Sequence, residues 1–145
     1  MTDSDWGLID YFSKDEAWGD PEKMDFPFVQ ELSKFRDFIK HPIIIVSGTQ
    51  GIHARNSLHY DGRAVDCIIP RLTLFDAWIA ANRFSFTGIG FYPDWEYNAV
   101  KPGGLHLEMC PTNPIKRFWM GLGHGTPRYI SMTLENIKLY YDDHH

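Results

Sequence analysis

The segment SLHYDGRAVDCII, residues 57–69, contains the clearest structural signal in the chain. Over residues 62–69 a glycine precedes a mostly apolar run, and this pattern predicts a turn that leads into a strand. Because successive side chains of a strand point to opposite faces, Asp66 lies on one face and Cys67 on the other. The segment therefore predicts a buried strand that carries one carboxylate.

Further elements are predicted on both sides of this strand from the spacing of apolar residues and from β-branched runs. They are two helices, over 27–40 and 73–83, and three strands, over 43–46, 86–92 and 105–109. His106 and Glu108 share one face of the last strand, since they are two residues apart. The expected fold is α+β, with a small, mainly antiparallel sheet packed by the helices.

Length and composition limit what the chain can be. Its 145 residues suit a single domain, with residues 1–25 as an irregular N-terminal arm held by aromatic side chains and residues 111–145 as a C-terminal extension. That extension contains a glycine-rich stretch, 121–125, followed by a strand or a helix over 129–141. The net charge is −5 without any basic block, which argues against nucleic acid as a partner. The longest apolar run, Ala77–Ala81, has five residues and is far short of the about 20 residues of a membrane span.

Three residues on or beside the predicted strands have side chains that bind zinc. His59, Asp66 and His106 offer two imidazoles and one carboxylate, and a catalytic zinc site uses three protein ligands and one open position. Spacing alone leaves a second interpretation open, in which these are three unrelated polar residues. Asp66 in particular can be a buried acid that accepts hydrogen bonds from loop amides.

The residues around these three resemble a known family. Residues 57–66 fit the pattern S-x-H-x-x-G-x-A-x-D, and Gly-Leu-His-Leu-Glu follows at 104–108. Together they resemble the M15 zinc peptidases, which include D-alanyl-D-alanine carboxypeptidases, murein endopeptidases and phage endolysins and share a fold with the hedgehog signalling domain. The resemblance covers roughly residues 11–110.

The resemblance implies a specific site and activity. His59, Asp66 and His106 would bind Zn²⁺ with water as the fourth ligand, and Ser57 would lie near the substrate. The implied fold is that of hedgehog and the D,D-peptidases. The implied reaction is hydrolysis of an amide bond in a peptidoglycan stem peptide, by an endopeptidase or a D,D-carboxypeptidase.

The chain also departs from the family pattern. Several M15 branches carry a carboxylate three residues before the last histidine ligand, where this chain has Gly103. Glu108 is the replacement, and it either takes the proton of the zinc-bound water or positions a ligand. An arginine common in the family is absent from residues 47–50, so Arg55 or Arg63 would bind a substrate carboxylate, unless both are ordinary surface residues.

Another nearby histidine has two interpretations. His53 lies one loop away from the motif, where it either stabilises an oxyanion or assists a proton transfer, or holds the loop by hydrogen bonds. The two cysteines, Cys67 and Cys110, are expected to be reduced thiols, with a disulfide between them as the alternative if their strands are neighbours.

Two rival functions and a location follow from the same residues. The missing acid at Gly103 permits a catalytically inactive binding module, and a virion component that digests the cell wall locally is also compatible. The first ten residues contain three acids and no secretory signal pattern, so we expect a cytoplasmic monomer released by host lysis or a holin, or else a virion-associated protein.

Overall fold

The computed structural model describes residues 1–123 and 125–144. Within these residues the chain forms a six-stranded sheet with the order β1-β2-β4-β3-β5-β6. The strands are β1 (Ile44–Ser47), β2 (Ala64–Ile68), β3 (Gly88–Tyr92), β4 (Gly104–Glu108), β5 (Arg117–Leu122) and β6 (Arg128–Ser131). In this part of the chain the neighbouring strands are antiparallel except β3 and β5, which are parallel.

Short polar residues cap the first turns of the first three α-helices along the chain by accepting hydrogen bonds from free backbone amides. The α-helices are α1 (Asp3–Gly7), α2 (Phe26–Ile39), α3 (Leu74–Ala81) and α4 (Leu134–His144), with short 3₁₀ helices η1 (Pro21–Lys23) and η2 (Leu58–Asp61). The side chain of Asp25 caps α2 by accepting a hydrogen bond from the Phe28 amide, and Thr73 caps α3 in the same way. The predicted helices over 27–40 and 73–83 are thus confirmed, with slightly different ends.

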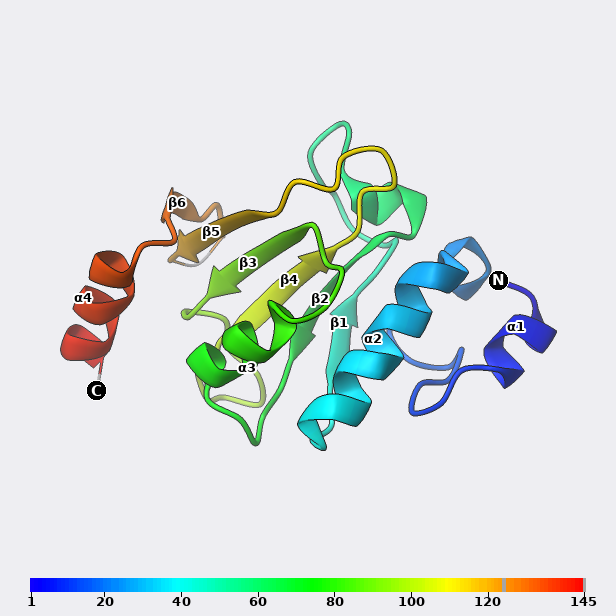
Figure 1. The fold of residues 1–145 in the computed structure, drawn as a ribbon. Coiled ribbons are helices and arrows are strands. Elements are labelled where there is room, and N and C mark those ends of the chain that lie inside the picture. Colours follow the sequence, from blue (N-terminus) through cyan, green and yellow to red (C-terminus); the bar gives the residue numbers. More distant parts are fainter. Residues whose placement is uncertain (124, 145) are drawn as a thin grey trace.

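Helices α2 and α3 cover one face of the sheet, as Figure 1 shows. On that face the strands present apolar side chains, among them Val65, Leu107 and Ile89, which form one core with Phe28 and Phe35 of α2. Burial of this apolar surface is the main stabilising contribution to the fold. The polar side chains of β2 and β4 therefore lie on the opposite face, which these two helices do not cover.

The N-terminal arm was expected to be irregular, but it contains two short helices, α1 and η1, and buried aromatic residues hold it in place. Trp6, Phe12 and Trp18 are all buried, and the rings of Trp6 and Phe12 both contact Trp18. The Trp18 carbonyl accepts a hydrogen bond of 2.7 Å from the Thr49 amide. A side chain at Gly48 would collide with that same carbonyl, so the arm packs tightly against the loop after β1.

The predicted α+β class with a mainly antiparallel sheet is confirmed, whereas the C-terminal prediction was incomplete. Strand β5 was missed, and the glycine-rich stretch 121–125 begins inside it. Residues 129–141 contain both alternatives, since β6 is followed by α4. No helix in the described residues has the length and apolar character needed to cross a membrane.

Candidate metal centre

The structure brings His59, Asp66 and His106 together on the uncovered face of the sheet. Asp66 of β2 and His106 of β4 are direct partners in the antiparallel register, so both side chains emerge on the same face. His59 comes from η2, immediately before β2. Each of the three offers one ligand atom, and these atoms lie within 4.8 Å of one another.

The sequence around His59 explains how η2 delivers this side chain. Ser57 caps η2, because its hydroxyl accepts a hydrogen bond from the His59 amide at 3.2 Å. Gly62 ends η2 with φ of +68°, a left-handed conformation, and a side chain there would collide with the Lys23 carbonyl. The chain therefore turns sharply from η2 into β2, which places His59 beside Asp66.

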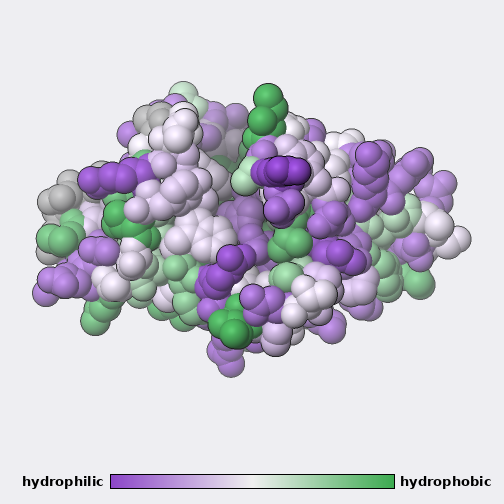
Figure 2. All heavy atoms as spheres, turned by 90° about the horizontal axis from the view of Figure 1, so that it is seen from above, coloured by the Kyte–Doolittle hydropathy of each residue, from purple (hydrophilic) through white to green (hydrophobic). Residues whose placement is uncertain are grey.

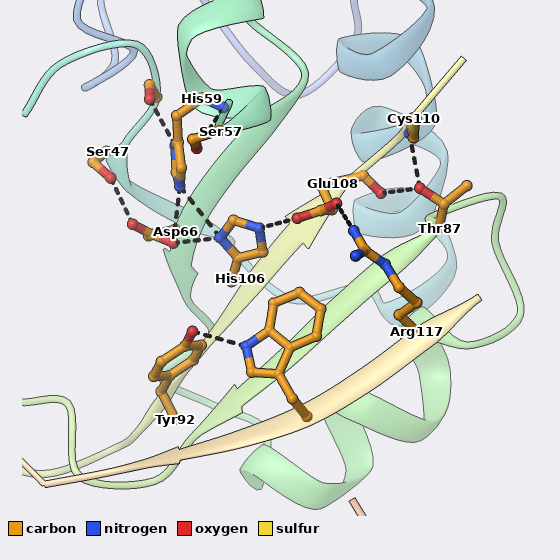
Figure 3. Close-up of polar contacts among 12 residues, drawn as sticks. Ser47, Ser57, His59, Asp66, Thr87, Tyr92, His106, Glu108, Cys110 and Arg117 are labelled. Atoms are coloured by element: carbon orange, nitrogen blue, oxygen red, sulfur yellow. Dashed lines mark hydrogen bonds and ion pairs between the residues drawn. The ribbon is translucent and has the colours of Figure 1, made fainter. Parts of the chain in front are cut away.

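Contacts on the far side of each imidazole orient its inward nitrogen. His59 is 3% exposed, and its Nδ1 lies 2.8 Å from the Gly48 carbonyl oxygen, which can only accept a hydrogen bond. His106 Nε2 lies 2.7 Å from Glu108 Oε1. When Nδ1 of His59 and Nε2 of His106 donate these bonds, the other ring nitrogens direct lone pairs inward. Figure 3 shows both rings meeting at Asp66.

The inward atoms suit a cation. His59 Nε2 and His106 Nδ1 are 3.2 Å apart, and Asp66 Oδ1 lies 3.5 Å from the first and 3.1 Å from the second. Asp66 Oδ2 accepts a hydrogen bond from the Ser47 hydroxyl at 2.8 Å, which leaves Oδ1 facing the histidines. Two lone pairs this close repel unless a proton or a metal ion lies between them. The donor set, two imidazoles and one carboxylate, fits a divalent ion such as Zn²⁺.

The pKa values of the metal-free residues reflect this crowding. Burial alone raises the pKa of Asp66, but the hydrogen bonds from His106 and His59 outweigh it and hold that pKa well below its usual range. Burial lowers the pKa of His106, but the bonds to Asp66 and Glu108 raise it to about 9. Without metal, His106 is therefore protonated at neutral pH and donates to Asp66 and Glu108.

Glu108 contacts His106 and a residue from a strand that the sequence did not reveal. Its Oε2 lies 3.2 Å from Arg117 Nη2, and the carboxylate is nearly buried. Gly88 of β3 pairs with Glu108 on one side and Arg117 on the other, so no side chain separates them. Burial raises the pKa of Glu108, but His106 and Arg117 outweigh burial and lower it, which keeps the carboxylate charged.

A second glycine of β3, Gly90, also leaves space between side chains of β4 and β5, two residues along the strand from Gly88. Gly90 pairs with His106 on one side and Trp119 on the other, and the two ring centroids are 5.4 Å apart. The Trp119 indole N–H donates a 2.8 Å hydrogen bond to the Tyr92 hydroxyl. A side chain at Gly90 would lie 2.6 Å from the Trp119 indole nitrogen. The glycines at 88 and 90 therefore let β5 side chains reach those of β4.

The cluster lies in an open cleft of about 1030 Å³. The loop segment 53–59 forms one wall, and aromatic residues with Arg117 line the other: Tyr92, Trp95, Trp119 and Tyr129. Figure 2 shows the molecule from above the view of Figure 1, with a hollow near the centre of the view that is bordered mainly by hydrophilic and weakly polar side chains. A volume of this size accommodates a peptide of several residues.

The structure brings some of the other predicted site residues to the cleft. Ser57, Arg55 and His53 all line it. The ring of His53 stacks on that of His59 with centroids 3.8 Å apart, and His53 Nε2 lies 2.8 Å from the Gln50 carbonyl. These contacts agree with the loop-holding interpretation of His53, whose ring also packs directly on that of the candidate ligand His59.

Arg63 does not line the cleft. Its Nε lies 3.6 Å from Asp25 Oδ1, and both residues line a separate small pocket of about 200 Å³. The cation that faces the cleft from the strand side is instead Arg117, which the sequence analysis did not select. The only signal for it is the alternation of Arg117, Trp119 and Gly121 with apolar residues, which indicates a strand but not its partner.

The two cysteines are free and distant from each other along the sheet. Cys67 is buried in the core, and its direct partner in β4 is Leu105, five residues before Cys110. At about 3.3 Å per residue this separation far exceeds the reach of a disulfide. The expected reduced thiols are therefore found, and the alternative of a bridge is wrong.

A comparison with protein-family models, with curated proteins and with solved structures found no match to this chain. The class of the site is accordingly defined by geometry and chemistry: a His59, Asp66 and His106 group that can hold a metal ion, in an open cleft. His124 and His145 lie outside the described residues.

Proposed function

We propose that this protein is a zinc-dependent hydrolase that cleaves an amide bond in peptidoglycan stem peptides, as an endopeptidase or a D,D-carboxypeptidase. The observation that carries the proposal is the convergence of three ligand atoms within 4.8 Å of one another in a cleft that leaves room for water and a substrate. The resemblance of residues 57–66 and 104–108 to the M15 zinc peptidases supports the choice of metal and substrate.

His59, Asp66 and His106 would hold the ion. Bound zinc supplies two effects in such a site, a lowered pKa of its water and polarisation of the scissile carbonyl. Gly48, through its carbonyl, and His53, through its stacked ring, fix the direction of His59. The aromatic wall excludes water from one side of a bound peptide.

Glu108 acts as a positioning residue in this proposal. Its Oε1 contacts His106 Nε2, whereas the atom of His106 that faces the cluster is Nδ1, on the other side of the ring. The carboxylate therefore holds the ring in the orientation that a ligand needs, an arrangement common around metal-bound histidines. Of the two roles open from the sequence, this geometry supports orientation of His106 over removal of a proton from water.

The test combines zinc content with cleavage of purified murein peptides and whole sacculi. Wild-type protein is expected to bind about one zinc per chain and to cleave at least one of these substrates. Asp66→Ala should lose both properties. Asp15→Ala, which removes an exposed carboxylate that does not line the cleft, should lose neither.

Two results would contradict the proposal in different ways. Wild-type protein without stoichiometric zinc would leave no metal-dependent function to this site. Stoichiometric zinc with no cleavage of any murein substrate would exclude hydrolysis and favour the binding module instead.

A further inference from the structure

The charged side chains of the cleft are balanced, whereas the chain as a whole is acidic. The protein carries a net charge of −5, yet the charged side chains among the described lining residues, with histidines neutral, are two arginines and two carboxylates. Asp66 is bonded to both histidines and to Ser47, and Glu108 to His106 and Arg117. A divalent ion would therefore give the cleft a charge of about +2, which favours an anionic ligand.

Arg117 is the cation whose position in the cleft is best defined. Its side chain is 64% exposed, whereas that of Glu108 is 10% exposed, so the pair is buried only on the carboxylate side. The contact with Glu108 uses a single terminal nitrogen, Nη2, while a guanidinium carries five N–H donors. Figure 3 shows this side chain reaching from β5 toward Glu108. The N–H groups of the Arg117 guanidinium that do not contact Glu108 are suited to bind a second carboxylate.

The register of the sheet sets how far this cation lies from the metal cluster. Arg117 is aligned through Gly88 with Glu108, two residues along β4 from His106. Two residues of strand span about 6.6 Å, and two residues of an extended peptide span about the same length, at about 3.3–3.6 Å per residue. A peptide that lies along β4 with its scissile amide at the cluster would thus place a group about two residues away beside Arg117.

From these observations we propose that Arg117 binds a carboxylate of the substrate about two residues from the scissile bond, and that the enzyme thereby distinguishes a carboxylate from a carboxamide at this position. This inference rests on the proposed function, because it takes the substrate to be a stem peptide. Such peptides carry several carboxylates, each of which can be amidated. Arg117 is then a specificity-determining residue supplied by β5.

The experiment compares a murein stem pentapeptide, which contains the D-Ala-D-Ala bond as well as the bonds nearer its start, with versions in which each carboxylate is converted in turn to a carboxamide. Binding to the zinc-loaded protein is followed before turnover by stopped-flow tryptophan fluorescence, since Trp95 and Trp119 line the cleft. Cleavage is measured as kcat/KM with the parent peptide and all amidated forms. The proteins are wild type, Arg117→Gln, Arg117→Lys and, as a control, Arg71→Gln, which changes an exposed arginine outside the cleft.

The expected result is a preference of about 10- to 100-fold for the parent over one amidated form, as for a charge-assisted hydrogen bond. Arg117→Gln should reduce that ratio to about twofold or less, Arg117→Lys should keep part of it, and Arg71→Gln should keep it all. Because the ratio is taken within each variant, a general effect of Arg117 on Glu108 or on zinc affinity cancels.

The outcomes separate this inference from the proposed function. Cleavage with equal affinity and equal kcat/KM for all forms, or a preference that survives in Arg117→Gln, would refute the role of Arg117 and leave the function intact. Arg117-dependent binding without cleavage would refute hydrolysis alone. Absence of binding to every peptide would refute both.

Discussion

Replacing Gly88 by alanine tests the orienting role of Glu108 without changing any residue of the cluster. A Cβ atom at position 88 would lie 2.5 Å from Glu108 Cγ and 2.6 Å from its Cδ. Carbon atoms in contact are about 3.5–4.0 Å apart, so the carboxylate must move by about 1 Å. A shift of that size lengthens the 2.7 Å contact with His106 beyond hydrogen-bonding distance. Gly88 does not have a positive φ, so the backbone itself accepts alanine.

The expected consequence is weaker metal binding. Loss of the partner that orients a metal-bound histidine costs about 10- to 100-fold in affinity, which corresponds to about 1.4–2.7 kcal/mol. The zinc dissociation constant is measured by competition with a chromophoric chelator, and thermal unfolding shows whether the fold is retained. Gly7→Ala is the matched control, since a Cβ at position 7 would meet nothing within 4 Å.

One result would refute this reasoning. If Gly88→Ala bound zinc as tightly as wild type but cleaved murein peptides about 100-fold more slowly or worse, Glu108 would not be holding His106. It would then act on the water or on the substrate as a proton acceptor, for which losses of about 10²- to 10⁴-fold are typical.

Three other perturbations address the same site and the thiols. Glu108→Gln keeps an oxygen acceptor for His106 Nε2, so its zinc affinity should stay within a few-fold of wild type. Glu108→Ala removes the acceptor and should lower the zinc affinity about 10- to 100-fold. Equal losses of affinity in the two variants, measured by chelator competition, would contradict this role. Because the metal-free pKa of His106 is raised to about 9, zinc must displace a proton from this side chain below that pH. The apparent dissociation constant for zinc should therefore rise about tenfold for each unit that the pH falls between 8.5 and 6.5. A dissociation constant that does not change with pH would exclude a proton on His106. Burial raises the pKa of Cys67, whereas a hydrogen bond with Thr112 lowers that of Cys110. A thiol reagent at pH 8 should therefore modify Cys110 quickly and Cys67 only in denaturant. A fast phase that persists in Cys110→Ser would refute this assignment.

The resemblance to a known family selected the cluster residues as a set, and local rules predicted only the direction of their side chains. Side chains alternate between the two faces of a strand, so Asp66 lies on the polar face of β2, and His106 and Glu108 share the polar face of β4. The pairing of β2 with β4 in the structure then aligns Asp66 with His106. The position of His59 follows from the serine cap and the glycine that bound η2.

Arg117 and Trp119 were not accessible, because their place depends on a pairing that no local pattern encodes. Their strand lies parallel to β3, and the two strands are joined through β4 and a long loop. The alternation within 117–122 indicates a strand, but only the sheet order shows that its polar face continues the site. Arg63 illustrates the converse: it lies next to the motif, yet the turn at Gly62 directs it toward Asp25.

The contact between the N-terminal arm and the loop after β1 determines how much of the chain the site requires. Trp18 accepts a hydrogen bond from Thr49, and the neighbouring Gly48 carbonyl receives the one from His59. His59, a candidate metal ligand, is thus anchored through a peptide unit that the arm holds in place. Transplanting only residues 57–108 into another scaffold, or trimming the arm as dispensable, would remove that anchor, so the smallest transferable unit of this centre includes the arm.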